Sequence, residues 1–568
     1  MSGAGPPVRV LVRKRYVDLP HGQVHLRVGG SGPPVVLLHD SPRSSLMHRD
    51  HVAWFGQRFT VYALDTPGYG NSTPLPADPA PSIPDFAAAL ETCLLALGLR
   101  APALYGFHTS SKIALALATR PQAPLGGAVL DGLSLPAALP PEDFIQSYML
   151  PFEVREDGSH LVTQWSKVLD FHRWFPWFSR TARTRLAMEL PGDEALHAYA
   201  LDTMMAGSSW SSAYAAAMRY AAREAFDGIR RPLTFTCRAD DVLFGFLDSL
   251  PEPLPAGCRR VPLGSDREGW RERLAAWFHD YAGHEEPPPV PDPLDAPGPA
   301  LRRGYVDLDA GQVHLRVAGV GARPPLLLLH DVPGSAAAVE ALGVALATDR
   351  RVLLPDLPGS GESDPLAVPD AAGYASALLA CLDRLSLDTV DVYAEHLAAP
   401  LALELATRAP ARVRRLVCDG LPPPDPAERA ALLPDYCPSL APRRDGAFWL
   451  TAWHLLGDRE ACWPWFARGR EAVRRRGPAL DAATRHRLVV DLMKQPDRYA
   501  EPVAAALSVA MDEGLAATGA RLIVLQDAAD PRDAGAASAL RLAPGARLAA
   551  RPSSAGELPA VLRRLLDA

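Results

Sequence analysis

The sequence repeats itself once, and this internal repeat limits what the chain can fold into. Residues 15–28 read RYVDLPHGQVHLRV, and residues 304–317 read GYVDLDAGQVHLRV. The match continues in the same order through four more pairs of segments: 35–42 with 326–333, 63–72 with 354–363, 104–122 with 392–410, and 128–136 with 416–424. A period of about 290 residues is far longer than that of a solenoid repeat. The sequence therefore predicts two copies of one whole domain.

A Pro-rich polar stretch, HEEPPPVPDPLDAPGPA at 284–300, separates the two copies and is typical of a semi-rigid linker. We therefore predict a first domain over 8–283, a linker over 284–300 and a second domain over 301–568. Two copies of one domain in a single chain can mimic a homodimer. We accordingly expect a pseudo-dimeric, twofold contact between the halves.

Each half alternates short apolar runs with runs of helical spacing. VVLLH and VYALD have the composition of strands buried on both faces, and PDFAAALETCLLALG has apolar residues at helical intervals. ALYGF is a further apolar run, followed at once by the helical run KIALALATR. This alternation predicts an α/β fold with a doubly wound, mostly parallel sheet in each half. Ligands of such sheets bind beyond the carboxyl ends of the strands.

Three motifs, present in both halves, resemble those of the α/β-hydrolase superfamily. In the first half these are the turn His39-Asp40-Ser41-Pro42, the DxPGxGxS turn from Asp65 to Ser72, and a strand–elbow–helix unit. The resemblance covers nearly the whole of both halves. It implies two tandem α/β-hydrolase domains, each with a helical cap, over about 133–230 and about 421–519.

A histidine stands at the centre of both elbows, where this superfamily usually has the serine of Gly-x-Ser-x-Gly. The elbows read Gly106-Phe107-His108-Thr109-Ser110 and Ala394-Glu395-His396-Leu397-Ala398. The superfamily's catalytic histidine normally lies near the C-terminal end of the domain. The corresponding segments here, VPLGSDREGWRERLAAWF and LAARPSSAGELPAVLRRLL, contain no histidine. A Ser-His-Asp triad is therefore not expected in either half.

A histidine–carboxylate pair could replace the triad. His108 would act as base or nucleophile, and Asp131 or Asp240, which follow neighbouring strands, would orient its ring. The backbone N–H of Thr109 and a donor from the turn at Asp40 or Ser41 would face a developing oxyanion. The equivalents in the second half are His396, Asp419 and Asp530. The alternative for each residue is structural: a histidine tolerated at an inactive elbow, and carboxylates that serve turns.

Differences between the caps favour the first half as the active one. Only the first cap has Asp157-Gly158-Ser159-His160, where the second has Asp445-Gly446-Ala447-Phe448. We therefore expect that His160 could point at the elbow. The first cap also carries a dense aromatic run, whose residues belong more often to a core than to a ligand site: Trp165, Phe171, Trp174, Phe175, Trp177 and Phe178. On the early strands His25 and His314 alternate with apolar residues, so we expect both to be exposed.

Composition excludes several functional classes. A net charge of −7 and a pI of about 6.2 provide no basic surface for nucleic acid. No apolar run is long enough to cross a bilayer. The seven cysteines form no CxxC pair, which indicates a reduced, cytoplasmic setting. Glycine-rich phosphate loops and metal-ligand clusters are missing from the sequence. We expect a small-molecule substrate, with no cofactor, metal, nucleic acid or membrane as partner.

These observations predict a cofactor-independent enzyme that acts on a small carbonyl or ester substrate. Hydrolysis, C–C cleavage and isomerisation all occur on such a fold, so the fold does not choose among them. The alternative is a pseudoenzyme or a small-molecule-binding protein, because both halves lack the serine and the triad histidine. The two hypotheses can also be combined, with the first half active and the second half a scaffold.

Overall fold

The computed structural model describes residues 10–296, 298–423, 425–475, 480–518, 521–527, 529–533 and 536–567. It divides into two compact units. The first runs through Glu153 and resumes over Lys167–Asp292, and the second comprises Val154–Ser166 and the chain from Pro293 onward. Residues 8, 297, 519 and 568, which belong to the predicted domain, linker and cap bounds, lie outside the described residues.

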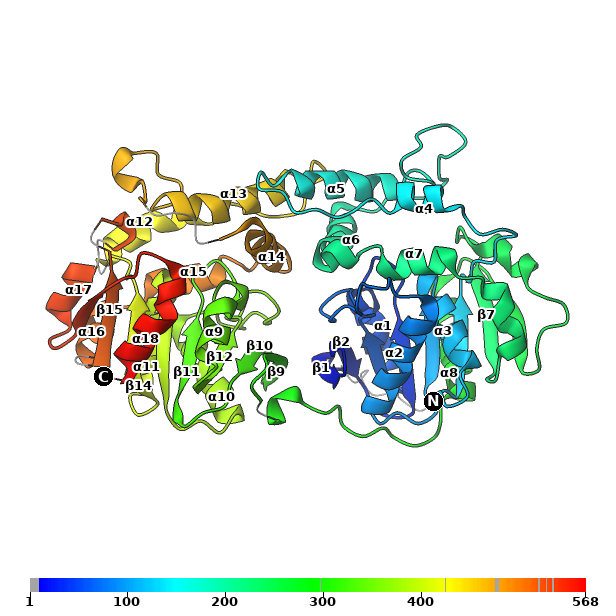
Figure 1. Cartoon of the computed structure of the whole chain (residues 1–568), viewed down its shortest axis with the longest axis horizontal. Coiled ribbons are helices and arrows are strands. Elements are labelled where there is room, and N and C mark those ends of the chain that lie inside the picture. Colours follow the sequence, from blue (N-terminus) through cyan, green and yellow to red (C-terminus); the bar gives the residue numbers. More distant parts are fainter. Residues whose placement is uncertain are drawn as a thin grey trace, which may run out of the picture. The chain divides into compact units, whose positions relative to one another are not determined.

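The first unit is built on an eight-stranded sheet of order β1-β2-β4-β3-β5-β6-β7-β8. Figure 1 draws this unit in blue to green. Its strands are β1 (Arg13–Leu19), β2 (Gly22–Gly29), β3 (Pro34–Leu38), β4 (Thr60–Leu64), β5 (Ala103–Phe107), β6 (Gly127–Asp131), β7 (Leu233–Arg238) and β8 (Cys258–Leu263). The pairs β1–β2 and β2–β4 are antiparallel, and all other neighbours are parallel. The sheet helices are α1 (Arg49–Phe55), α2 (Ile83–Ala96), α3 (Thr109–Thr119) and α8 (Arg267–Tyr281).

The second unit repeats this architecture in the order β9-β10-β12-β11-β13-β14-β15-β16. Its strands are β9 (Arg302–Leu308), β10 (Gly311–Ala318), β11 (Arg323–Leu329), β12 (Arg350–Pro355), β13 (Val390–Glu395), β14 (Val413–Asp419), β15 (Leu522–Gln526) and β16 (Arg547–Ala550). Its helices outside the cap are α9 (Glu340–Leu346), α10 (Ala371–Arg384), α11 (Ala399–Arg408), α16 (Met511–Thr518), α17 (Ala536–Leu542) and α18 (Leu558–Asp567). The doubly wound α/β fold predicted for both halves is confirmed.

Apolar runs form the central strands because helices cover both faces of each sheet. Every residue of β3 is buried, and so is every residue of α3 except its last. The start of α2 is defined by a capping box between Ser82 and Asp85, which satisfies backbone N–H groups at the helix end. In the part of the chain that the structure describes, no helix is both long and apolar enough to span a membrane.

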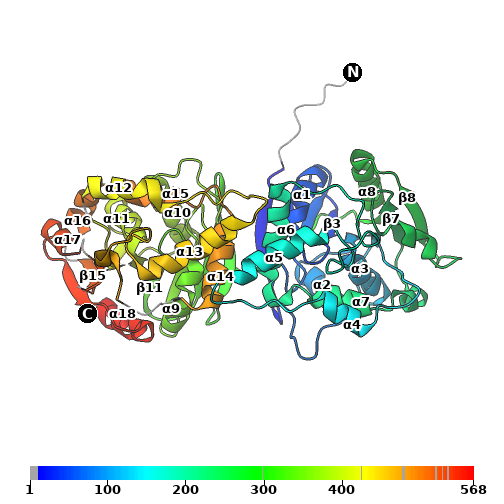
Figure 2. The same ribbon diagram turned by 90° about the horizontal axis from the view of Figure 1, so that it is seen from above.

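Cap helices lie between the sixth and seventh strands of each unit's chain order, as the resemblance implied. The first group is α4 (Glu142–Tyr148), α5 (Ser159–Phe171), α6 (Asp193–Ala206) and α7 (Ser212–Arg219), and the second is α12 (Pro426–Tyr436), α13 (Ala447–Ala461), α14 (Ala482–Met493) and α15 (Glu501–Ser508). Figure 2, seen from above, shows α6 and α7 over the first sheet and α13 and α14 over the second. The caps therefore cover the sheet edge at which the elbows lie.

The exposure predicted for His25 and His314 is wrong, because both side chains are buried. His25 Nδ1 lies 2.7 Å from Asp65 Oδ2, and His314 Nδ1 lies 2.8 Å from Asp356 Oδ2. Both carboxylates belong to the DxPGxGxS turns, which pack against β2 and β10. The strand residues that alternate with apolar neighbours thus face a buried polar network and not solvent.

Candidate active site

His108 occupies a strained elbow between β5 and α3. Its φ is 48° and its ψ is −109°, a backbone region that residues other than glycine rarely adopt. The Ser110 hydroxyl stabilises the turn, since it accepts the Phe107 N–H at 2.9 Å and lies 3.1 Å from the Leu38 carbonyl oxygen. Strain of this kind persists only where the surroundings hold it, and it is concentrated at functional sites. The elbow predicted from the sequence is therefore present, with an imidazole at its apex.

The carboxylate that meets the His108 ring is Asp241. Nε2 of His108 lies 2.9 Å from Oδ2 and 3.1 Å from Oδ1 of Asp241, which follows β7. The Leu243 N–H donates to Asp241 Oδ1 at 2.8 Å and orients the carboxylate. The side chains of His108 and Asp241 are 24% and 17% exposed, so the pair is partly open to solvent.

Asp240, which the sequence suggested as an orienting group, points elsewhere. Its carboxylate is half-exposed and pairs with Arg238, two residues before it. An alignment of the two halves would have identified Asp241 in place of Asp240. CRADD at 237–241 aligns with QDAAD at 526–530, so Asp530 corresponds to Asp241 and not to Asp240.

The environment of His108 favours a protonatable ring. Burial alone would lower the pKa of His108, but the hydrogen bond to Asp241 and its charge more than offset this effect, and the net pKa is raised. Burial would likewise raise the pKa of Asp241, yet the contact with His108 holds it below its usual value. Asp241 therefore stabilises the imidazolium form of His108, as the carboxylate of a catalytic pair must.

Asp131, the other predicted partner, lies close to the elbow but does not bond the His108 ring. Its buried Oδ2 accepts from the Tyr105 hydroxyl at 2.9 Å and from Trp270 Nε1 at 3.1 Å, and its backbone carbonyl accepts the His108 N–H at 2.9 Å. Burial raises the pKa of Asp131 to about 6. Trp270 lies in the C-terminal segment where the superfamily's catalytic histidine was expected. Asp131 therefore supports the elbow backbone and leaves orientation of the ring to Asp241.

Gly132 gives the His108 ring the space to reach Asp241. Its φ is +69°, and a Cβ atom there would lie 2.5 Å from His108 Cδ2 and 3.0 Å from Nε2. We predict that Gly132→Ala displaces the ring from Asp241 and lowers the pKa of His108, because the ring loses the hydrogen bond and the charge that raise it. Histidine NMR titration measures this change. Gly245→Ala is the control, because a Cβ there meets nothing within 4 Å. An unchanged His108 titration in Gly132→Ala would contradict the proposed packing.

Two backbone N–H groups remain open near His108. Thr109 is the first residue of α3, and Ser41 lies on the turn after β3. Within the described residues, neither amide has an intramolecular acceptor. His39 supports this turn, since its Nε2 accepts the Thr66 N–H at 2.9 Å and its Nδ1 lies 2.7 Å from the Asp40 carbonyl oxygen. The geometry leaves Thr109 N–H and Ser41 N–H available to a ligand.

The turn after β3 is tied to the first cap. Arg43 Nε donates to Asp202 Oδ2 at 2.8 Å, and the Ser44 hydroxyl donates to Asp202 Oδ1 at 2.5 Å. Asp202 lies on α6 and is fully buried. Asp40, beside them, has a buried Oδ1 for which the described residues provide no hydrogen-bond partner. The cap thus holds the turn in place while one carboxylate oxygen of Asp40 stays unsatisfied.

The second elbow is closed. The His396 side chain is completely buried, and neither ring nitrogen has a hydrogen-bond partner among the residues that the structure describes. The ring packs edge-on against Trp463 at a centroid distance of 4.3 Å. Burial, together with the nearby charge of Arg532, holds the pKa of His396 well below its usual value. Asp530, the counterpart of Asp241, is bound by Arg474 at 3.0 Å. Asp419 is bound by the Tyr393 hydroxyl at 2.7 Å and by Arg551.

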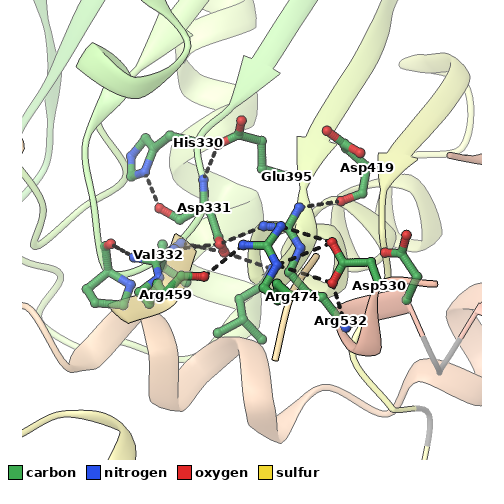
Figure 3. A network of polar contacts seen from close by, with 12 residues as sticks. His330, Asp331, Val332, Glu395, Asp419, Arg459, Arg474, Asp530 and Arg532 are labelled. Carbon is green, nitrogen blue, oxygen red and sulfur yellow. Dashed lines mark hydrogen bonds and ion pairs between the residues drawn. The ribbon is translucent and has the colours of Figure 1, made fainter. Parts of the chain in front are cut away.

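A carboxylate of the chain itself binds the amide of the second elbow, and Figure 3 shows this carboxylate, Asp331, within a network of arginines. Oδ1 of Asp331, the counterpart of Asp40, accepts the N–H groups of Leu397 and Val332, each at 2.9 Å. Arg459 donates to the other oxygen, Oδ2, at 2.5 Å. Arg459 and Arg532 stand where the first half has Phe171 and Leu243. The arginines of the second half therefore hold Asp331 against the elbow amide.

His160 does not face the first elbow, contrary to expectation. It belongs to the second unit, where its Nε2 lies 3.1 Å from His486 Nδ1 and its ring packs against Trp453. Trp165 also belongs to that unit and is buried beside Phe448. Two other aromatic residues of this cap, Phe175 and Phe178, are each more than 40% exposed. The glycine before α5 explains the placement of His160, because Gly158 packs directly on the Trp453 ring.

Comparisons with known proteins agree with the two observed folds. A family model for the alpha/beta hydrolase fold matches residues 33–191 and 324–439. The chain is similar to 2-hydroxy-6-oxononadienedioate/2-hydroxy-6-oxononatrienedioate hydrolase 2 of Pseudomonas putida, with 33% identity over 125 residues, 21% of this chain and 43% of that protein. It is also similar to 2-hydroxy-6-oxo-2,4-heptadienoate hydrolase of Pseudomonas putida, with 35% identity over 116 residues, 20% of this chain and 42% of that protein. Both matches span less than half of the relatives' length.

Among solved structures, a hydrolase from Pseudomonas aeruginosa is 21% identical, with 47% of this chain and 96% of that chain covered and a TM-score of 0.35. The family match occurs once in each half, on two sheets that share one strand order. These findings identify the chain as two α/β-hydrolase domains in tandem.

Proposed function

We propose that the first domain is a cofactor-independent enzyme that acts on a small ester or carbonyl substrate, and that the second domain is not catalytic. One contrast supports this proposal above all. His108 is partly exposed and bonded to Asp241, with Thr109 N–H and Ser41 N–H open beside it. His396 is enclosed, and Asp331 occupies the equivalent amide.

His108 has the geometry of a general base. Since Nε2 faces Asp241, the other ring nitrogen, Nδ1, is the atom that can take a proton. In hydrolysis, Nδ1 would remove a proton from water while the water oxygen attacks the substrate carbonyl carbon. Thr109 N–H would then bind the oxyanion, and Asp241 would stabilise the imidazolium until the proton passes to the leaving group. This sequence needs neither a serine nor a second histidine.

The related proteins support the substrate class. The relatives from Pseudomonas putida are named as hydrolases of 6-oxo acids, and a further relative from Acinetobacter baylyi, 32% identical over 105 residues, is named (E)-2-((N-methylformamido)methylene)succinate hydrolase. These names describe small carbonyl compounds. The same base could also serve C–C cleavage or isomerisation, in which it takes the proton from a substrate hydroxyl or carbon.

The proposal is tested by measuring kcat/KM for a panel of short aryl esters. The wild type is compared with Asp241→Asn and Asp530→Asn. We expect Asp241→Asn to lower kcat/KM by about 10²-fold, because an amide cannot stabilise the imidazolium. Asp530→Asn should leave kcat/KM unchanged. Since base catalysis needs neutral His108, wild-type activity should fall as pH drops through its raised pKa. Asp241→Asn removes the stabilising charge and should move this decline to lower pH.

Two results would count against the proposal. Equal activity of the wild type and Asp241→Asn would exclude the His108–Asp241 pair as the machinery. The ester panel can be complemented by a panel of small ketones, whose proton exchange is followed in D2O. If no folded variant turned over any compound of either panel, the result would favour the pseudoenzyme hypothesis. The closed second site makes that hypothesis the better description of the second domain in either case.

A further inference from the structure

A buried lysine lies in an aromatic cage within the first cap. Nζ of Lys167, on α5, lies 3.3 Å from the ring centroid of Trp210, 5.4 Å from that of Trp177 and 5.5 Å from that of Phe171. The side chain is 5% exposed, and Nζ has no hydrogen-bond partner within the described residues. A primary amine so placed is enclosed by apolar rings without an oxygen acceptor.

The surroundings of Nζ disfavour the charged form of this amine. The ring faces attract an ammonium group, but its N–H groups have no oxygen or nitrogen acceptor within the described residues, and removing a charge from water without such a partner is costly. The nearest carboxylate along α5, Asp170, is engaged by Arg180 at 2.5 Å. The Tyr148 hydroxyl, beside the cage, lies 3.2 Å from that of Tyr214. Burial accordingly lowers the pKa of Lys167 to about 7.

The cage adjoins the elements that surround the elbow. The carbonyl oxygen of Trp210 accepts the Tyr69 hydroxyl at 3.1 Å, and Tyr69 follows β4 beside the His39 ring. On its other side, Trp177 Nε1 donates to the Tyr148 carbonyl oxygen at 3.0 Å. The second domain has Leu455 at the position of Lys167. The amine is thus a feature of the first domain, the domain with the open elbow.

We propose that Lys167 is a reactive amine that forms an imine with small aldehydes or ketones entering the first cap. The neutral Nζ would add to the carbonyl carbon to give a carbinolamine. Loss of the carbonyl oxygen as water, with both amine hydrogens, would then give the C=N bond, with no change in oxidation state. Desolvated lysines of this kind are the ones that perform carbonyl chemistry, because a neutral amine is the nucleophile.

The chain suits a direct test because it contains only four lysines, namely Lys14, Lys112, Lys167 and Lys494. Lys112 is the internal control, since burial lowers its pKa to about 8 but its Nζ donates to the Ala217 carbonyl oxygen at 2.8 Å. Lys494 is paired with Glu362 and Asp491, and its pKa is raised. NMR titration of 13Cε-labelled lysine in the full chain should show a Lys167 midpoint near 7. A midpoint in the ordinary lysine range would overturn the proposal.

The chemical arm uses propanal with sodium cyanoborohydride, which transfers hydride to an imine and fixes it as a secondary amine. At pH 7.5 we expect alkylation of Lys167 several-fold faster than of Lys112, and slowest alkylation of Lys494, as read by peptide mass mapping. Lys167→Leu, which copies the second domain, should fold and lose only this adduct. Alkylation of other lysines without Lys167 would overturn the proposal. His108→Ala should still be alkylated at Lys167, so the outcome is separate from that of the proposed hydrolysis.

Discussion

Replacing His108 with alanine should reduce ester hydrolysis by the full chain by about 10³-fold or more, whereas His396→Ala should leave it unchanged. Without His108, Asp241 loses the imidazole that it orients, and the site loses the only described histidine at an open elbow. Removal of His396 breaks no hydrogen bond of its ring with the described part of the chain, because neither ring nitrogen has one there. kcat/KM for the most reactive ester of the panel measures both effects.

The two variants control for one another, since each removes one elbow histidine from one copy of the same fold. His396→Ala leaves a cavity beside Trp463 and should lower the stability of the second domain, so activities must be compared per folded molecule. Loss of activity in His396→Ala with folding intact would show that the second domain takes part in catalysis. Retained activity in His108→Ala would mean that the elbow histidine is not the base.

The second large effect concerns stability and compares two equivalent carboxylates. We expect Asp356→Ala to lower the free energy of unfolding of the second domain by about 5 kcal/mol, and Asp65→Ala to lower that of the first by about 3 kcal/mol. Fully buried Asp356 accepts from Arg316, His314 and the N–H groups of Ala336 and Glu362. Asp65 accepts from His25 and the N–H groups of Ser45 and Asn71, and no arginine among the described residues donates to it. Removal of Asp356 therefore also takes one of two ion-pair partners from the buried Arg316 guanidinium, whose Nε lies 3.1 Å from Glu340.

Hydrogen exchange followed by mass spectrometry assigns each loss of stability to its domain, through peptides from β2 and β4 or from β10 and β12. Equal losses in the two variants would show that Arg316 contributes nothing through Asp356.

The stability that these two carboxylates contribute should decrease at low pH. Although burial would raise the pKa of Asp65 and Asp356, their partners hold the pKa of each below its usual value. The stability they contribute is present above about pH 4 and is lost as pH falls further.

The sequence alone was sufficient for the architecture. The repeat and the alternation of apolar runs with helical runs predicted two doubly wound sheets, because strands buried between helices must be apolar along their whole length. The position of both elbow histidines could also be read from the sequence, since a strand–turn–helix unit places its central residue at a known point in space. Both features depend on local sequence and on one fold, and the strand order of the two sheets and the family match confirm the fold.

Only the tertiary structure decided which groups meet. Asp240 and Asp241 are neighbours in a turn, and the path of the backbone after β7 determines that Asp241 reaches His108 while Asp240 turns to Arg238. His160 joins the second domain because Gly158 packs on Trp453, 295 positions away. Asp40 and Asp331 occupy equivalent positions in the repeat. Asp331 binds the elbow amide and is held by Arg459, which replaces Phe171 of the first half. Long-range contacts of this kind have no local pattern in the sequence, because they depend on side chains brought together by folding.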